Sequence, residues 1–243
     1  MAEDAKEATG SMGDDTPLAV LSDKYRPLYH YFRQNFSQVT NPPIDSLREN
    51  KVMSLKTRFG NLGNILDFSK LTKDNIYVLN SPILSNAQFE KFLKFFGNNN
   101  KVLDCTFSKD DDLETSINLL KVKSEQAVRE GIKQIILSDK NISENRMPMP
   151  MLLCIGAINT HLVKLGLRGY VSINVQTGDA LDTHSFATLI GVGATTVNPY
   201  LAFDSLYQRH SKKLFGNFTF DECVSRYIKS VSYTHLTLPT MFE

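Results

Sequence analysis

The chain has 243 residues, 42% of them apolar, so it is long enough to bury a substantial core. Its 27 basic and 26 acidic residues give a formal net charge of +1 without a long basic block, which argues against a nucleic acid as partner. The three cysteines are far apart and include no CxxC pair, which predicts buried thiols in a reducing compartment and no zinc or iron–sulfur site. No stretch has the ~20 apolar residues of a membrane span, and the acidic start lacks the apolar run of a signal peptide, so we expect a cytoplasmic protein without membrane contact.

The first hundred residues predict an irregular N-terminal part. The stretch KYRPLYHYFRQNF places Leu28, Tyr31, Phe32 and Phe36 at helical spacing, and we expect this aromatic face to be buried. Two prolines at positions 42 and 43 must end that helix and fix the turn that follows it. After a polar stretch, IYVL predicts a strand and AQFEKFLKFF predicts a helix.

From Lys101 onward, strands and helices alternate regularly. The segments KVLDCTF, QIILS, YVSINV and TTVN have the apolar character of buried strands, whereas residues 111–131, MLLCIGAINTHLVKL and HSFATLI have helical periodicity. Strands that alternate with helices predict βαβ crossovers and a parallel sheet, so the fold class is α/β. Four such units form either half of an eight-fold barrel or a small open sheet, and periodicity does not choose between them.

Polar residues near the strand ends are the candidate ligand-binding residues. Asn198 closes the last strand, at the carboxyl edge where α/β sheets bind their ligands, although a strand-to-helix turn at the following proline explains it equally well. Asp179 and His184 occur together in TGDALDTH, where an acid–base pair is one interpretation and helix capping by Asp182 or Thr183 is another. No nucleophile-elbow pattern accompanies them, so we predict no catalytic residue.

Two further motifs favour structural roles. GVGATTV follows a helix and precedes a strand, which is the order of a helix C-cap and not of a phosphate-binding loop. The aspartates at 110–112 open a helix, where they favour the positive end of its dipole and where Ser108 is the expected N-cap. They lack the alternating spacing of a calcium loop, so we predict no metal site.

Several stretches together resemble the central domain of the glutamate synthase large chain. GSMGDDTPLAVLSDKYRPLYHYFRQNFSQVTNPPIDSLRE matches its opening, and LNSPILSNAQF, QIILSDK and GVGATTVNPYLAF follow in the same order. The resemblance covers residues 1–231, with an irregular part (1–100) and repeated βα units (101–231), and it implies a rudimentary, half TIM-barrel-like fold with an irregular N-terminal cap. The tail SYTHLTLPTMFE, residues 232–243, fits nothing in the family, and we predict that it is an artefact of a broken gene and that Met1 is an internal methionine of a longer chain.

The resemblance also implies a reaction. In the family an amidotransferase domain hydrolyses glutamine, ammonia crosses an internal tunnel, and a domain with FMN and an iron–sulfur cluster adds it to 2-oxoglutarate and reduces the product to glutamate. The central domain connects these two domains, which are its implied partners together with a small subunit or ferredoxin. It binds no cofactor itself and is inactive alone.

Matching positions imply that Met12, Thr40 and Asn41 line the ammonia tunnel. Two other hypotheses stay open from the residues alone. One is a free-standing α/β enzyme that binds a small molecule at the carboxyl edge of its strands. The other is an interaction module that uses the apolar surface left by half a barrel.

Overall fold

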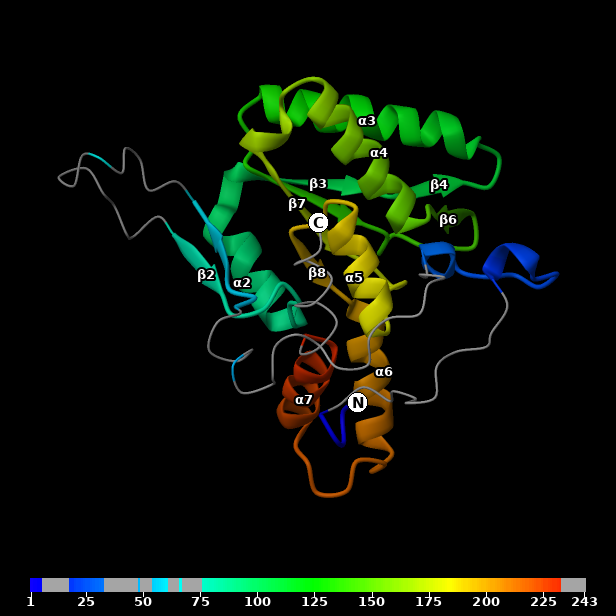
Figure 1. Cartoon of the computed structure of the whole chain (residues 1–243), viewed down its shortest axis with the longest axis vertical. Coiled ribbons are helices and arrows are strands. Elements are labelled where there is room, and N and C mark those ends of the chain that lie inside the picture. Colours follow the sequence, from blue (N-terminus) through cyan, green and yellow to red (C-terminus); the bar gives the residue numbers. More distant parts are fainter. Residues whose placement is uncertain (6–17, 33–47, 49–53, 61–65, 67–75, 233–243) are drawn as a thin grey trace.

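A computed structural model describes residues 1–5, 18–32, 48, 54–60, 66 and 76–232 of the chain. At its centre lies a parallel sheet of four strands in the order β3-β5-β7-β8 (Figure 1). These strands are β3 (Asn100–Asp104), β5 (Gln134–Ser138), β7 (Ser172–Gln176) and β8 (Thr196–Asn198). The predicted α/β class with a parallel sheet is therefore confirmed.

One long helix joins each pair of neighbouring strands. The helices are α3 (Leu113–Arg129), α4 (Met151–Lys164) and α5 (Thr183–Gly191), and α6 (Tyr200–Ser211) and α7 (Phe220–Ser232) follow the last strand. Short 3-10 helices are η1 (Ala19–Leu21), η2 (Leu28–Phe32), η5 (Gly97–Asn99) and η6 (Arg168–Tyr170). Before the sheet, β1 (Thr57–Phe59) pairs antiparallel with β2 (Tyr77–Leu79), and α2 (Asn86–Phe96) leads into β3.

The segment KVLDCTF forms two strands where the sequence predicts one. The chain leaves the sheet at Cys105, whose backbone N–H donates to the carbonyl of Ser138 and whose carbonyl accepts from Met149. Beyond this point β4 (Thr106–Ser108) pairs antiparallel with β6 (Arg146–Pro148). The apolar run continues through the break because Cys105 is itself fully buried.

Alternate residues of the strands face two different layers. Ile135 and Leu137 of β5 belong to the main core, which also contains buried residues of α3, α4 and α5. Ile136 points to the opposite face, where it packs in a second cluster with Phe89 and Phe92 of α2. The three crossover helices therefore cover one face of the sheet, and α2 covers part of the other.

The outer edge of β8 is extended by the segment that precedes α2. Ile83 forms a parallel bridge with Val197. The N–H of Leu84 donates to the carbonyl of Val197 at 2.9 Å, and the N–H of Val197 donates to the carbonyl of Pro82 at 2.8 Å. The segment just before α2, which precedes the regular half of the chain, thus lies beside the last strand.

The aromatic stretch near the N-terminus differs from the prediction. Over the described residues it is the five-residue helix η2, with Tyr31 51% and Phe32 52% exposed, so the predicted buried helical face is wrong there. Leu28 and Tyr29 are half-buried against the main core. Periodicity shows which side chains share a face, but it does not show that another element covers that face. Phe36 and the two prolines lie outside the described residues.

Residues close together in the sequence determine where helices α3 and α5 begin and end. Asp112, and not Ser108, is the N-cap of α3, where its carboxylate accepts from the N–H of Thr115. Ser108 is the last residue of β4, so its backbone is still extended at that point. At the end of α5, Gly193 has φ +123° and donates its N–H to Ile190, which confirms that GVGATTV ends a helix.

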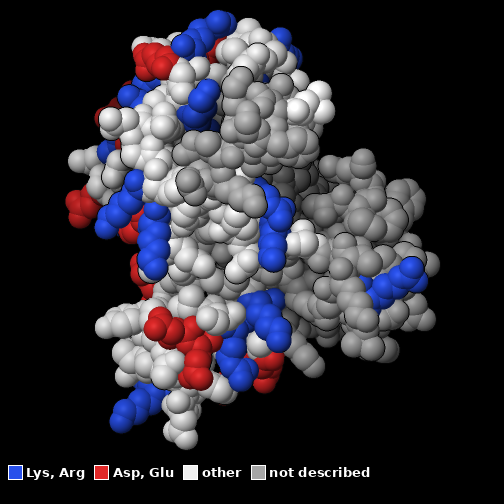
Figure 2. Space-filling model, turned by 90° about the vertical axis from the view of Figure 1, so that its left-hand side faces the viewer, with Lys and Arg blue, Asp and Glu red and all other residues white. Residues whose placement is uncertain are grey.

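The surface of the described part mixes charges of both signs. Figure 2 shows basic and acidic side chains interspersed with uncharged surface on one face. Among the helices that the structure describes, none has both the length and the apolar character that a bilayer crossing requires.

Candidate functional site

Polar side chains form a row across the carboxyl ends of the four strands. Asp104, Ser138, Gln176 and Asn198 are partners in the register of neighbouring strands. The hydroxyl of Ser138 donates to Oε1 of Gln176 at 2.8 Å, and Nε2 of Gln176 donates to Oδ1 of Asn198 at 3.2 Å. At the other end of the row, Nη2 of Arg146 lies 3.1 Å from Oδ2 of Asp104.

Asn198 is fully buried at the end of β8. Its amide nitrogen donates to the carbonyl of Leu84 at 2.9 Å and to Oδ1 of Asn86 at 3.0 Å. Its side chain therefore joins the last strand to the start of α2. Its predicted place at the carboxyl edge is right, while a role in ligand binding stays a prediction.

Asp139, directly after β5, is the buried acid of this edge and is 1% exposed. Its carboxylate accepts from the hydroxyl of Thr177 at 2.5 Å and from the N–H of Gly178 at 3.1 Å. Burial raises the pKa of Asp139 above its ordinary value, although these bonds and one from the Tyr200 hydroxyl act in the opposite direction. Burial, followed by the charge of Asp139, raises the pKa of Tyr200.

Sequence reasoning missed Asp139 and Tyr200. Asp139 follows the buried strand QIILS at the same edge that singled out Asn198, so the rule of the carboxyl edge could have found it. Nothing in the local sequence around Tyr200 indicates that its hydroxyl meets Asp139.

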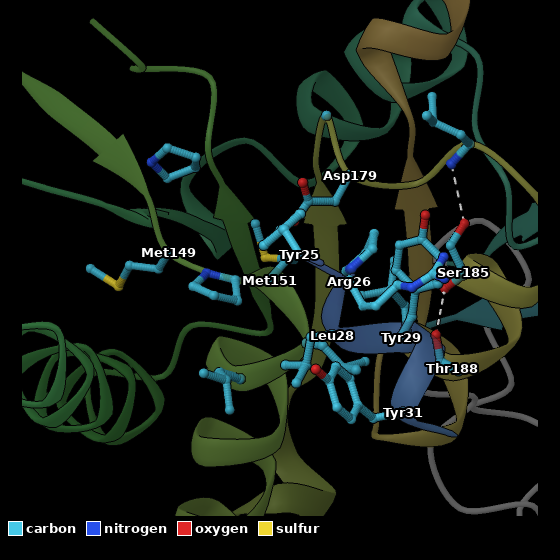
Figure 3. Close-up of a pocket in the computed structure, with 18 residues that line it drawn as sticks. Tyr25, Arg26, Leu28, Tyr29, Tyr31, Met149, Met151, Asp179, Ser185 and Thr188 are labelled. Carbon is cyan, nitrogen blue, oxygen red and sulfur yellow. Dashed lines mark hydrogen bonds between the residues drawn. The ribbon is translucent and has the colours of Figure 1, made fainter. Parts of the chain in front are cut away.

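A pocket of about 450 Å³ lies beside this edge (Figure 3). Its walls come from residues 25–31, from the turn before α4 and the first residues of α4, from the loop after β7, and from α5. Side chains on the wall include Tyr25, Tyr29, Tyr31, Met149, Met151 and Asp179. Most of the wall is thus aromatic or aliphatic, and Asp179 is its acidic group.

Asp179 links the pocket to the start of α4. The N-cap of this helix, Pro150, supplies no side-chain cap, and the nearby backbone N–H of Met151 favours the charged form of the Asp179 carboxylate. The positive end of the helix dipole therefore faces the acid. Desolvation by the surrounding protein nevertheless raises the pKa of Asp179 above its ordinary value.

The His184 side chain contacts Tyr29, which lines the pocket, and forms no hydrogen bond to Asp179 among the described residues. Its Nε2 donates to the carbonyl oxygen of Tyr29 at 2.8 Å, and its ring meets the Tyr29 ring edge-on at 6.2 Å. In the same stretch, Asp182 is the N-cap of α5 and accepts from the N–H of Ser185 at 2.8 Å, as the capping interpretation predicts.

The three candidate ligand-binding residues predicted from the sequence therefore have different surroundings. Asp179 lines the pocket, His184 anchors one of its walls, and Asn198 lies within the sheet. The tunnel candidates Met12, Thr40 and Asn41 lie outside the described residues and stay predictions. Over the described ranges, no group of three or more His, Cys, Asp or Glu side chains is placed to hold a metal ion.

Comparison with known proteins decides the family. A family profile described as "Glutamate synthase central domain" matches residues 1–237. The chain belongs to the glutamate synthase central domain family. The match reaches past residue 231, and the origin of residues 232–243 stays a prediction.

Curated relatives of this central domain are much longer proteins. The chain is 50% identical over 234 residues to a glutamate synthase [NADPH] large chain of Azospirillum brasilense, with 95% of the chain and 15% of that protein covered. It is 41% identical over 232 residues to the protein of that name from Bacillus subtilis (strain 168), with 95% and 15% covered. It is 41% identical over 220 residues to a chloroplastic ferredoxin-dependent glutamate synthase of Spinacia oleracea, with 86% and 13% covered. The central domain thus spans about 15% of the length of the two bacterial relatives.

Among solved structures, the central domain is similar to the YdjI aldolase from Escherichia coli K12. The TM-score is 0.23 at 15% identity, with 65% of this chain and 66% of that chain covered. A likeness of this size carries no argument about fold or activity.

Proposed function

We propose that this chain is the connecting domain of a glutamate synthase that makes two glutamates from glutamine, 2-oxoglutarate and a reductant. The observation that carries the proposal is the family match over residues 1–237 in a chain that spans about 15% of its bacterial relatives. The flanking amidotransferase domain and the domain with FMN and an iron–sulfur cluster perform the chemistry, and the connecting domain is inactive alone. The proposed enzyme is cytoplasmic, and a small subunit or ferredoxin supplies its electrons.

The role we assign does not depend on the electron donor. Relatives named for NADPH and relatives named for ferredoxin both contain this segment, at 50% and 41% identity. A function that both kinds of enzyme need is the passage of ammonia between two active sites. We therefore place the work of this domain in that passage and not in electron entry.

The arrangement of the sheet supports a half-barrel. The four strands are neighbours in chain order, and residues of the crossover helices α3, α4 and α5 share one core with the same face of the sheet. A barrel wall has this winding on the face that the crossover helices cover, and α2 packs against part of the opposite face. Within the described residues β3 and β8 do not pair with each other, so the wall is open.

The anchoring of residues 18–32 supports the tunnel role. Met12 precedes this stretch in the sequence, and Thr40 and Asn41 follow it. The stretch is fixed to α5 by the bond from His184 to the Tyr29 carbonyl and to the core by Leu28. A fixed stretch beside the carboxyl edge, with prolines 42 and 43 stiffening the chain after it, suits a wall that keeps ammonia from water and from protonation.

The test uses a full-length large chain that contains this domain, with Met12→Ala or Thr40→Ala. We expect glutamine hydrolysis to continue while less of the ammonia reaches 2-oxoglutarate, so that glutamine consumed exceeds 2-oxoglutarate consumed and free ammonia accumulates. The matched control is Thr115→Ala, which changes an exposed threonine on α3. Normal coupling in both tunnel variants would count against the tunnel role.

A second experiment tests inactivity. The chain alone is examined for flavin absorbance and for glutamate formation, and then mixed with separately made flanking domains. We expect no turnover alone and restored coupling on mixing. Bound flavin or turnover by the chain alone would favour the free-standing enzyme instead.

A further inference from the structure

Two carboxylates at the carboxyl edge, the buried Asp139 and the exposed Asp179, lack a basic partner among the described residues. Within the described residues neither Asp139 nor Asp179 forms an ion pair. Burial and the nearby acids Asp182 and Asp179 raise the pKa of Tyr29, which lines the same pocket. An ammonium group forms charge-assisted hydrogen bonds with an unpaired carboxylate of this kind.

The pocket wall beside Asp179 is mostly apolar. Figure 3 shows Met149 and Met151 on one side and Tyr29 with Ser185 and Thr188 on the other. Tyrosine rings attract cations through their faces, and methionine side chains adapt to the shape of an apolar group. The volume of about 450 Å³ lies within the range of small-molecule sites, about 300 to 1,000 Å³.

We propose that this pocket binds a small organic molecule through a primary ammonium group. The ammonium group donates to the carboxylate of Asp179 in a charge-assisted hydrogen bond, and the apolar body lies between Tyr29 and Met151. The nearby Met151 N–H favours the charged form of the carboxylate, and the lone pairs of the carboxylate accept from the ligand. The pocket shares residues 25–31 with the stretch whose anchoring supports the tunnel role, but none of its described lining residues is a predicted tunnel residue.

Two kinds of molecule carry this ammonium chemistry, a free amino acid and a simple amine. Arg26 also lines the pocket, and its Nε donates to the hydroxyl of Ser22 at 3.3 Å. A guanidinium is the preferred partner of a carboxylate. Arg26 therefore strengthens the binding of an amino acid by pairing with its carboxylate. A simple amine has no carboxylate, so Arg26 does not strengthen its binding.

The test measures binding of L-norleucine and of n-butylamine by ligand-observed NMR to a full-length large chain that contains this domain. We expect Asp179→Asn to weaken binding about tenfold or more, because the ammonium group loses its charged partner. Asp179 is exposed and asparagine has nearly the same shape, so we expect the fold to be retained. Asp110→Asn, an exposed change elsewhere on the surface, is the matched control and leaves binding unchanged.

Further variants distinguish the two kinds of ligand and provide a second test of the pocket. If the ligand class is amino acids, Arg26→Gln weakens norleucine and leaves butylamine unchanged. Leu28→Trp, which fills the pocket from its half-exposed wall, abolishes binding of both and serves as the second variant if Asp179→Asn does not fold. No binding of either ligand, or equal binding by the wild type and these pocket variants, overturns the proposal. Coupling of the two active sites is measured separately, so failure here is distinct from failure of the tunnel role.

Discussion

At the residue scale, Asp139 is an acid that the fold buries beside three donors. The hydroxyl of Thr177 and the N–H of Gly178 donate to it and the Tyr200 hydroxyl also favours its charged form, yet desolvation outweighs these effects and raises its pKa. A folded-state pKa above the unfolded value means that the folded protein binds the proton more tightly. Its stabilising contribution is therefore complete below the unfolded pKa and is lost as the pH rises through the folded pKa.

This sign gives a pH prediction. Asp139→Asn stays neutral at every pH, so its free energy of unfolding should increase relative to the wild type as the pH rises from about 4 to neutral. Urea unfolding of both proteins across this pH range measures the difference. Asp110→Asn, an exposed change, is the control. A difference between Asp139→Asn and the wild type that does not change with pH would contradict the raised pKa.

At the element scale, α2 depends on its first turn. Ser85 accepts from the N–H of Gln88 at 3.2 Å, and the Gln88 side chain accepts from the N–H of Ser85 at 3.0 Å, which is a capping box. The helix carries the fully buried Phe92 into the second cluster. A weaker start therefore loosens the layer that covers the second face of the sheet.

Ser85→Ala should lower the free energy of unfolding by about 1 kcal/mol, because the backbone N–H of Gln88 loses its acceptor. Chemical denaturation measures it. Ser205→Ala, at an exposed position within α6, should stay within about 0.5 kcal/mol of the wild type. Equal effects of the two changes would show that the capping box does not stabilise α2.

At the scale of the whole molecule, the sheet is held together by residues far apart in sequence. Asn198 joins β8 to the carbonyl of Leu84 and the side chain of Asn86, across 114 and 112 positions of the chain. The backbone bridge between Ile83 and Val197 lies beside this contact. The last strand, β8, and the segment that leads into α2 are thus held together at one edge of the sheet.

Asn198→Ala should lower the free energy of unfolding by about 2 to 4 kcal/mol, because buried acceptors and the Gln176 amide lose their partner. Urea unfolding measures the loss. Asn98→Ala, at an exposed position in η5, is the matched control with an expected change of about 0.5 kcal/mol or less. A loss for Asn198→Ala no larger than that of the control would mean that the fastening contributes nothing.

Local signals in the sequence predict much of the regular half. β5 coincides with the predicted strand QIILS, α4 follows MLLCIGAINTHLVKL to within one residue, and Asp182 caps α5 as predicted. Strand alternation predicts the parallel sheet, and the quoted motifs predict the family that the comparison shows. Each of these features depends on residues close together in the chain or on a long specific motif.

The tertiary structure decided the rest. It brought the Tyr200 hydroxyl close to Asp139 and placed Asp179 near the first residue of α4. It also directed the side-chain amide of Asn198 to the carbonyl of Leu84 and not into the pocket. It also left the aromatic side chains of η2 partly exposed. Periodicity and capping are short-range effects, whereas the groups that meet at a sheet edge are chosen by strand register and by packing across more than a hundred residues. For this reason the sequence predicted the class and family, and only the folded chain assembled the pocket.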